Sequence, residues 1–436
     1  MTRRLVVGVD SSTQSCKVQI VDAENSDIVR TGRSSHPDGT EADPNLWWEA
    51  LLEAIQKAGG LDDVSAISIA GQQHGMVLLD SAGQVVRQAL LWNDMRSSKE
   101  AQELIDHFGS KWLAENTGSV PVPSFTSTKL RWVRNNEPQL LDSIAAVCLP
   151  HDYLSWRLSS HYPDVSKIFT DRSDASGTGY FNPRTNEYLP EVIEFCLGKE
   201  VLLPRIVDHL EPAAQVRVDF SDRRIHIGAG MGDNAGAAQG LGLTPGKFAV
   251  SLGTSGTVFG SFRAGVSDET GIISGFADAE GNFLPLVCTL NAARVIEWGA
   301  ALLGVSLDEF GELALKAKPG AGGVVVTPYL EGERTPNLPD ATASVTGITL
   351  LNGNRENFAR ACIEGMLNGL RFGGDVIMDQ GQSIDSIALI GGAAANQAVR
   401  LIAQEIFEAP VTVPEPAEYV ALGAAMQAAK LQNFTA

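Results

Sequence analysis

The sequence contains the same short pattern near its start and again past its midpoint. In each copy, two apolar, β-branched runs flank a hydroxyl-rich turn: Leu5–Val9, Asp10–Cys16 and Lys17–Val21, then Phe248–Leu252, Gly253–Gly256 and Thr257–Phe262. Each copy predicts a β-hairpin, and alternating helices and strands follow both. The alternative is a chance resemblance between two hairpins. The pattern favours a duplicated α/β core with a cleft between its halves.

Apolar periodicity and turn residues predict the elements that follow each hairpin. In the first half we expect helices at 44–58, after Arg96 through Phe108 and from Lys129 onward, strands at 66–70 and 76–80, and loops at 71–75 and 117–128. In the second half we expect helices at 355–372, 398–407 and 418–431 and a strand at 386–390. The turn Thr244-Pro-Gly246 predicts a boundary between two domains, residues 1–243 and 244–436.

Charge and cysteine content exclude several classes of function. The 436 residues include 33 Lys and Arg against 52 Asp and Glu, a net charge of −19, which argues against nucleic acid or an anionic membrane as a partner. The five cysteines are scattered and form no Cys-x-x-Cys motif, so neither a disulfide framework nor a zinc site is indicated. No stretch reads as a signal peptide or a membrane span, and we expect a cytoplasmic protein.

A glycine-rich stretch, Ile227–Gly242, carries a single ionisable side chain, Asp233. Glycines permit close backbone approach to a ligand, so one interpretation makes Asp233 a catalytic base at the floor of the cleft. The other interpretation makes it the N-cap of the Ala-rich helix that follows. The segment alone leaves both open.

The two hydroxyl-rich turns offer backbone and side-chain donors that could clamp a polyphosphate from opposite sides of the cleft. Asp10 is an oxygen ligand suited to Mg²⁺, and Lys17 on the adjoining strand could supply a positive charge. Each signal is also ordinary hairpin chemistry when taken alone.

Three further segments have both a functional and a structural interpretation. Ile390–Asn396 reads as strand, small-residue loop and helix, which suits a nucleotide or close packing, but it lacks the dinucleotide G-x-G-x-x-G pattern. His74 lies beside Gln73 in a glycine-flanked loop and serves either a polar ligand or the structure itself. Glu331–Pro336 is either a surface turn with local ion pairs or part of the cleft wall.

Taken together, these residues resemble the FGGY carbohydrate kinases and, within them, the xylulokinases. The resemblance covers nearly the whole chain. It rests on Asp10–Thr13, Ala70–Gly75, Leu91–Arg96, Ser124–Asn136, Gly232–Ala235, Ser251–Gly256, Ala343–Glu364 apart from Cys362, and Gly391–Asn396. The number and order of these motifs identify the family more firmly than any one of them.

The resemblance implies an α/β fold of two actin-like (ribonuclease H-like) domains that close around ATP and a sugar. It implies phosphoryl transfer from Mg-ATP to a terminal hydroxyl, most simply of D-xylulose. By position, Asp233 would be the base and Asp10 would hold Mg²⁺ at the catalytic centre. The sugar would be bound by Gln73, His74, Trp92, Asp233 and Asn234. The phosphates and adenosine would be bound by Thr13, Lys17, Gly253, Thr254, Gly256, Gly392, Ala393 and Asn396. The expected partners are a small sugar and ATP. A homodimer is one assembly considered, and the sequence leaves the oligomeric state open.

This chain departs from the family pattern at several places. Ser12 stands where the family usually has Gly, Gln73 stands where xylulokinases commonly have Met, and the chain ends soon after Leu422, which leads us to expect weaker docking of the final helix. Glycerol kinases carry an Arg-Glu pair in place of Gln73-His74, which argues against glycerol. The rival functions are a kinase for gluconate, ribulose or a related polyol, a non-catalytic sugar or nucleotide sensor, and an actin- or chaperone-like ATPase.

Overall fold

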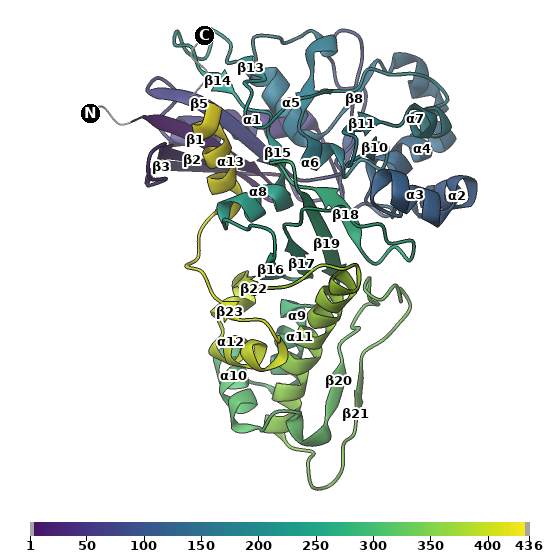
Figure 1. Ribbon diagram of the computed structural model, residues 1–436, viewed down its shortest axis with the longest axis vertical. Coiled ribbons are helices and arrows are strands. Elements are labelled where there is room, and N and C mark those ends of the chain that lie inside the picture. Colours follow the sequence, from purple (N-terminus) through teal and green to yellow (C-terminus); the bar gives the residue numbers. More distant parts are fainter. Residues whose placement is uncertain (1–3, 432–436) are drawn as a thin grey trace.

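The computed structural model describes residues 4–431. Two lobes lie one above the other in Figure 1, each built on one large sheet. We call residues 4–243 together with the last helix the first lobe, and residues 244–418 the second lobe. The outermost residues of the two expected domains, 1–3 and 432–436, lie outside the described residues.

The sheet of the first lobe has the strand order β13-β14-β5-β1-β2-β3, with β15 beside β5. Its strands are β1 (Leu5–Ser11), β2 (Ser15–Asp22), β3 (Ile28–Ser35), β5 (Val64–Gly71), β13 (Ala214–Gln215), β14 (His226–Ile227) and β15 (Met231–Gly232). β1 pairs antiparallel with β2 and parallel with β5, and this register sets Asp10 between Lys17 and Ala70. The predicted first hairpin is confirmed.

The sheet of the second lobe repeats this arrangement in the order β18-β19-β17-β16-β22-β23. Its strands are β16 (Lys247–Leu252), β17 (Gly256–Gly260), β18 (Ser274–Ala277), β19 (Phe283–Thr289), β22 (Ser386–Ile390) and β23 (Val411–Thr412). β16 pairs antiparallel with β17 and parallel with β22, as β1 does with β2 and β5. The duplicated α/β core expected from the two hairpins is confirmed.

Helices and short strand pairs surround the two sheets. In the first lobe they are β4 (Glu41–Ala42), α1 (Pro44–Lys57), β6 (Val77–Leu79), β7 (Ala89–Leu90), α2 (Ser98–Phe108), α3 (Ser110–Thr117), α4 (Thr126–Asn136), η1 (Pro138–Ser143), β8 (Ala146–Cys148), α5 (Pro150–Leu158), η2 (Val165–Lys167), β9 (Phe169–Thr170), α6 (Arg172–Ala175), β10 (Phe181–Asn182), β11 (Glu187–Tyr188), α7 (Pro190–Leu197), β12 (Arg205–Ile206) and α8 (Asp233–Gly240). Later in the chain they are α9 (Ala293–Leu303), α10 (Leu307–Lys316), η3 (Ala321–Gly323), β20 (Val325–Thr327), β21 (Ser344–Thr346), α11 (Arg355–Asp379), η4 (Gly392–Ala395), α12 (Gln397–Ile406) and α13 (Tyr419–Lys430).

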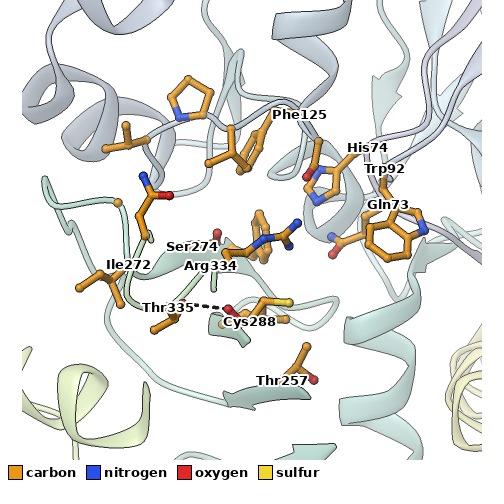
Figure 2. A pocket seen from close by; sticks show the side chains of 18 of the residues that line it. Gln73, His74, Trp92, Phe125, Thr257, Ile272, Ser274, Cys288, Arg334 and Thr335 are labelled. Atoms are coloured by element: carbon orange, nitrogen blue, oxygen red, sulfur yellow. Dashed lines mark hydrogen bonds between the residues drawn. The ribbon is translucent and has the colours of Figure 1, made fainter. Parts of the chain in front are cut away.

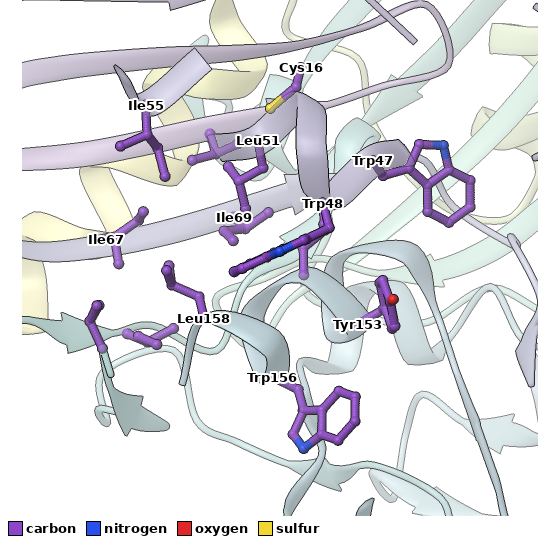
Figure 3. Packing of buried hydrophobic residues seen from close by; sticks show 14 of the residues in the cluster. Cys16, Trp47, Trp48, Leu51, Ile55, Ile67, Ile69, Tyr153, Trp156 and Leu158 are labelled. Carbon is purple, nitrogen blue, oxygen red and sulfur yellow. The ribbon is translucent and has the colours of Figure 1, made fainter. Parts of the chain in front are cut away.

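The core of the first lobe forms where α1 and α5 cover one face of the sheet (Figure 3). α1 begins where Asp43 accepts a hydrogen bond from the backbone N–H of Asn45, and Pro44 fits its first turn. Trp47 and Leu51 are almost fully buried in the same apolar cluster as Ile67 and Ile69 of β5. Burial of side chains of this size stabilises the folded state by about 1.5–3 kcal/mol each.

The last helix, α13, crosses back from the second lobe onto the opposite face of the first-lobe sheet, beside β1 and α8 (Figure 1). Close backbone approach requires glycine here, because a Cβ on Gly423 would lie 2.1 Å from the carbonyl oxygen of Gly236. Ala425 and Ala428 are completely buried against Val6 and its neighbours. The helix that we expected to dock weakly is therefore closely packed.

Two element boundaries differ from those expected by three residues or more. The segment 117–128, expected as a loop, contains the start of α4 at Thr126. The hydroxyl of Thr128 donates to the carbonyl of Phe125, three residues back, so a hydroxyl that suggested a loop is bonded to the backbone within the first helical turn. α11 continues seven residues past its expected end at Phe372. Gly373 does not end it, because a Cβ there would lie 2.8 Å from Val287 and the glycine serves packing.

Candidate active site

Two cavities lie between the lobes and meet at the start of α8. The first cavity has a volume of about 530 Å³ and is lined by side chains from both lobes (Figure 2). The second cavity, of about 660 Å³, extends along the loop after β22 and the segment 413–420. Asp233, Asn234 and Thr257 line both cavities. Side chains at this junction can therefore contact two ligands at once.

Asp233 is the first residue of α8, and Gly232 occupies the cap position. The alternative that Asp233 caps the helix is therefore wrong in position, because the helix begins at Asp233 itself, one residue earlier than it would if Asp233 were the cap. Its Oδ1 accepts from the backbone N–H of Asn234 at 2.8 Å and from Nδ2 of Asn234 at 3.1 Å. Among residues 4–431, no donor contacts Oδ2, so this oxygen is free to accept a proton.

The surroundings of Asp233 make its carboxylate a stronger base than a free aspartate. Burial, together with the negative charges of Asp10 and Asp174, raises the pKa of Asp233 to about 7. A base whose pKa lies near neutral pH accepts a proton readily, and about half of it is ionised at that pH.

Asp10 and Lys17 meet at the mouth of the first hairpin, as the register of β1 and β2 requires. Lys17 Nζ lies 3.2 Å from Asp10 Oδ2 and 2.5 Å from Glu418 Oε2. Burial raises the pKa of Asp10, against the opposing effects of Lys17 and Ser12. The Ser12 hydroxyl donates to Asp10, and Ser12 does not have a left-handed backbone, so this turn accommodates a serine where the family usually has glycine.

His74 is held in a left-handed conformation, with φ of 68°, by bonds to its backbone. Lys129 Nζ and the Thr126 hydroxyl donate to its carbonyl oxygen at 2.9 and 3.1 Å. Its Nδ1 donates to the carbonyl of Gly177 at 2.5 Å. Burial, Lys129 and Arg334 lower the pKa of His74 to about 3, so the ring is neutral and its Nε2 is an acceptor toward the first cavity.

The other residues predicted to bind sugar lie beside His74 and Asp233. Gln73 Oε1 accepts from Asn234 Nδ2 at 3.0 Å, which links the loop after β5 to α8. Trp92 lines the first cavity, and its Nε1 donates to the hydroxyl of Thr13 at 2.8 Å. The structure thus brings together all of the residues predicted for the sugar, and it joins them to the predicted phosphate turn through Thr13.

The segment 331–336 forms part of the cleft wall. Arg334 and Thr335 line the first cavity, so the surface-turn alternative describes only Glu331, which pairs with Arg294 at 3.1 Å. Glu333 is buried, and its carboxylate accepts from the backbone N–H of Leu290 at 2.6 Å. This bond anchors the loop to the end of β19.

The residues predicted for the nucleotide are only partly gathered around the second cavity. Lys17 and Gly392 line it, together with Ser12 and Arg400, which were not predicted. Ala393 and Asn396 lie in the same loop but outside the cavity lining, and Asn396 caps α12 through the backbone N–H groups of Ala398 and Val399.

The second hydroxyl-rich turn contributes different residues from those expected. Gly253 and Thr254 are exposed at the turn, and their carbonyls accept from the start of α9. Gly256 is buried, and a Cβ there would lie 2.7 Å from Leu370, so packing explains this glycine. Ser255 and Thr257 line the first cavity instead.

A buried charge cluster supports the strand that leads into Asp233. His151 Nδ1 lies 2.6 Å from Asp174 Oδ2, and both side chains are completely buried. Although burial opposes it, Asp152, Asp174 and Asp171 raise the pKa of His151 far above its usual value, so the imidazole is charged. The His151 ring packs against Gly230, where a Cβ would lie 2.3 Å from Cδ2. The cluster therefore fixes the backbone just before the base.

Comparison with known proteins places this geometry in a family. Residues 5–240 match the FGGY family of carbohydrate kinases, N-terminal domain, and residues 248–431 match the C-terminal domain of the same family. The chain belongs to the FGGY carbohydrate kinases. It is 42% identical to a xylulose kinase of Streptomyces coelicolor over 98% of this chain and 88% of that protein. The crystal structure of a xylulose kinase from Bifidobacterium adolescentis superposes with a TM-score of 0.93 at 43% identity, over 99% of this chain and 94% of the other.

A gluconate kinase from Lactobacillus acidophilus has the same fold, with a TM-score of 0.91 at 22% identity over 99% of this chain and 90% of the other. Family membership makes ATP the expected phosphoryl donor of this sugar kinase. Among residues 4–431, every helix is too short or too polar to cross a bilayer.

Several residues of this FGGY kinase site were not predicted from the sequence. Lys129 and Phe125 belong to the motif Ser124–Asn136, in which the residue types alone do not indicate a functional role. The Phe125 ring packs against His74, with ring centroids 4.8 Å apart. Arg334 lay in a segment whose role was left open. His151 and Asp174 are separated by 23 positions, and nothing in the sequence signals their contact.

Proposed function

We propose that this chain phosphorylates D-xylulose at its terminal hydroxyl, using ATP, to give D-xylulose 5-phosphate. The position of Asp233 carries the proposal, because this one carboxylate lines both the cavity that suits a small sugar and the cavity that suits a nucleotide. The xylulose kinases named above support the choice of sugar, since they match nearly the whole chain.

The sugar occupies the first cavity with its terminal hydroxyl at Asp233. His74 Nε2 accepts a hydrogen bond from another hydroxyl, and Asn234 fixes the Asp233 carboxylate while Gln73 fixes Asn234. As the new O–P bond forms, the bond from the γ-phosphorus to the bridging oxygen breaks and ADP leaves, while Asp233 takes the proton of the attacking oxygen. Transfer of this kind depends on positioning and charge stabilisation more than on covalent chemistry of the protein.

The residues at the second cavity fit Mg-ATP. Asp10 lines that cavity with a carboxylate, and Mg²⁺ prefers carboxylates, waters and phosphate oxygens. Asp10 would hold the ion, which when bound neutralises charge on the phosphates. Lys17 supplies a further positive charge at the same wall, while the glycine-rich loop from Gly391 leaves room for a nucleotide.

A panel of acceptors tests the proposal. We expect purified protein with Mg-ATP to release ADP far faster with D-xylulose than with D-ribulose, D-gluconate, glycerol or no acceptor. A higher kcat/KM for gluconate or ribulose would show that D-xylulose is the wrong acceptor, while the reaction would still be ATP-dependent sugar phosphorylation. Equal ADP release without acceptor would favour an ATPase, and sugar binding without any ADP release would favour a sensor.

A further inference from the structure

The first cavity contains a cation that the mechanism above does not use. The guanidinium of Arg334 extends from the second lobe toward His74 in the first (Figure 2). Across residues 4–431, no carboxylate lies within ion-pair distance of it, and its side-chain contact is the thiol of Cys288. Its five N–H groups can only donate, so a ligand must supply the acceptors.

The loop holds Arg334 in place before any ligand arrives. Its backbone N–H donates to Glu333 Oε1 at 2.7 Å, and the other carboxylate oxygen accepts from Asn291 Nδ2 at 2.9 Å. Thr335 Oγ1 donates to the carbonyl of Cys288 at 2.8 Å. With both neighbours fixed to β19 and the turn after it, the guanidinium is preorganised in the cavity.

The position of Arg334 separates it from the phosphate chemistry. It lines the first cavity and not the second, where Asp10 and Lys17 lie. Asp233 and neutral His74 can only accept and therefore suit hydroxyl hydrogens. The amide N–H groups of Asn234 already donate to Gln73 and Asp233, and the Trp92 N–H donates to Thr13. A ketone oxygen has no hydrogen to donate, and Arg334 offers it a charged donor without a carboxylate partner.

We propose that Arg334 binds the ketone oxygen of the sugar and so makes the enzyme selective for a ketose over the corresponding alditol. This inference rests on the proposed function, which places the terminal hydroxyl at Asp233. A site built to pair with one polar group strongly rejects an analogue that lacks it. The contact also joins the sugar to both lobes, since Arg334 belongs to the second and His74 to the first.

The test compares D-xylulose with xylitol, in which a hydroxyl replaces the ketone. For the unmodified enzyme we expect a large preference in kcat/KM for D-xylulose. Arg334→Met removes the donors, and we expect kcat/KM to fall about 100-fold for D-xylulose and less than about 3-fold for xylitol, with the KM for ATP unchanged. Arg334→Lys keeps the positive charge but loses the planar guanidinium. Its kcat/KM for D-xylulose should therefore lie between those of the unmodified enzyme and Arg334→Met.

Arg294→Met is the matched control, because Arg294 forms an exposed ion pair in the same region and should leave both substrates unaffected. Equal losses with both substrates, a fall in kcat without a change in KM, or no change would each overturn the role of Arg334. Failure of the unmodified enzyme to phosphorylate D-xylulose would instead overturn the proposed function. Thermal unfolding of each variant confirms that it is folded.

Discussion

At the scale of single residues, the site depends on how one carboxylate is buried. Asp233 lies close enough to Asp10 and Asp174 for their charges to add to the effect of burial on its pKa. An isolated surface aspartate would be ionised but a weak base. The same residue in this position has a pKa of about 7 and suits proton transfer near neutral pH.

Replacing Asp233 by Asn should remove the base while keeping the shape of the site. We expect kcat for sugar phosphorylation to fall by about 10²–10⁴-fold, with sugar and ATP still binding. The melting temperature should stay the same or rise, because the variant removes a carboxylate whose charge is desolvated and repelled by Asp10 and Asp174. Asp208→Asn, on an exposed side chain, serves as the control. A variant with near-normal turnover would exclude Asp233 as the base.

The pKa of Asp233 also predicts how the rate depends on pH. The base must be ionised, and its pKa in the free enzyme is about 7. The logarithm of kcat/KM for the sugar should therefore rise by about one unit per pH unit below 7 and level off above it. Initial rates between pH 5 and 9 at fixed Mg-ATP measure this. A profile that stays flat down to pH 5 would contradict the assignment.

Some site residues could be predicted from the sequence and others could not. Asp233 and His74 lie in glycine-rich segments with few other functional groups, so their roles can be inferred from the sequence alone. Lys129 reads as an ordinary helix residue, yet it is completely buried below His74. Arg334 reaches the site from the other lobe. Contacts between such distant segments arise only when the chain folds.

At the scale of elements, the sequence predicts the strands and hairpins better than the ends of helices. Both hairpins carry apolar runs around a polar turn, and in both lobes the two runs pair as antiparallel strands. The start of α4 and the end of α11 were misplaced because hydroxyls and glycines, which often end a helix, are satisfied there by local bonds and packing.

The first turn of α4 supports the strained backbone of His74, and Lys129 is its main donor. Lys129→Met removes the bonds to the carbonyls of His74 and Ser124. We expect kcat/KM for the sugar to fall by about 10–100-fold, since relaxing His74 by even a small distance impairs positioning. The KM for ATP should change little. Steady-state kinetics with each substrate varied in turn measures both effects.

Lys199→Met is the matched control for this variant. Lys199 also donates to two backbone carbonyls, those of Leu141 and Ile144, but lies away from both cavities. It should cost stability without changing the KM for the sugar. If both variants reduced sugar kinetics equally, a general loss of stability would explain the result and the positioning role of Lys129 would be wrong.

At the scale of the whole molecule, the two lobes are joined by more than the chain between them. The edge strand β18 contacts the first lobe, where the backbone N–H of Gly275 donates to the carbonyl of Gly118 at 2.8 Å. The segment that leads to α13 lines the second cavity, and Glu418 pairs with Lys17. Closure of the lobes around ligands would therefore act on both cavities together.

The packing of α13 against α8 can be tested at one glycine. Gly423→Ala would place a Cβ 2.1 Å from a backbone oxygen of α8, which forces the helices apart. We expect a loss of about 1–3 kcal/mol of stability and reduced activity, since α8 begins at Asp233. Gly369→Ala in α11 meets nothing within 4 Å and should be neutral or stabilising by contrast. Thermal or urea unfolding distinguishes them, and an equally stable Gly423→Ala variant would contradict the packing argument.

The return of α13 to the first lobe has a consequence during synthesis on the ribosome. The sheet of that lobe is translated first, but the helix that covers one of its faces, α13, is translated only after almost the whole second lobe. At roughly 5–20 residues per second, this interval lasts on the order of 10–40 s. Throughout it, Val6 and Ala66 have no α13 to cover them. We therefore expect this apolar face of the nascent first lobe to stay uncovered until α13 is made, and the enzyme completes its catalytic lobe last.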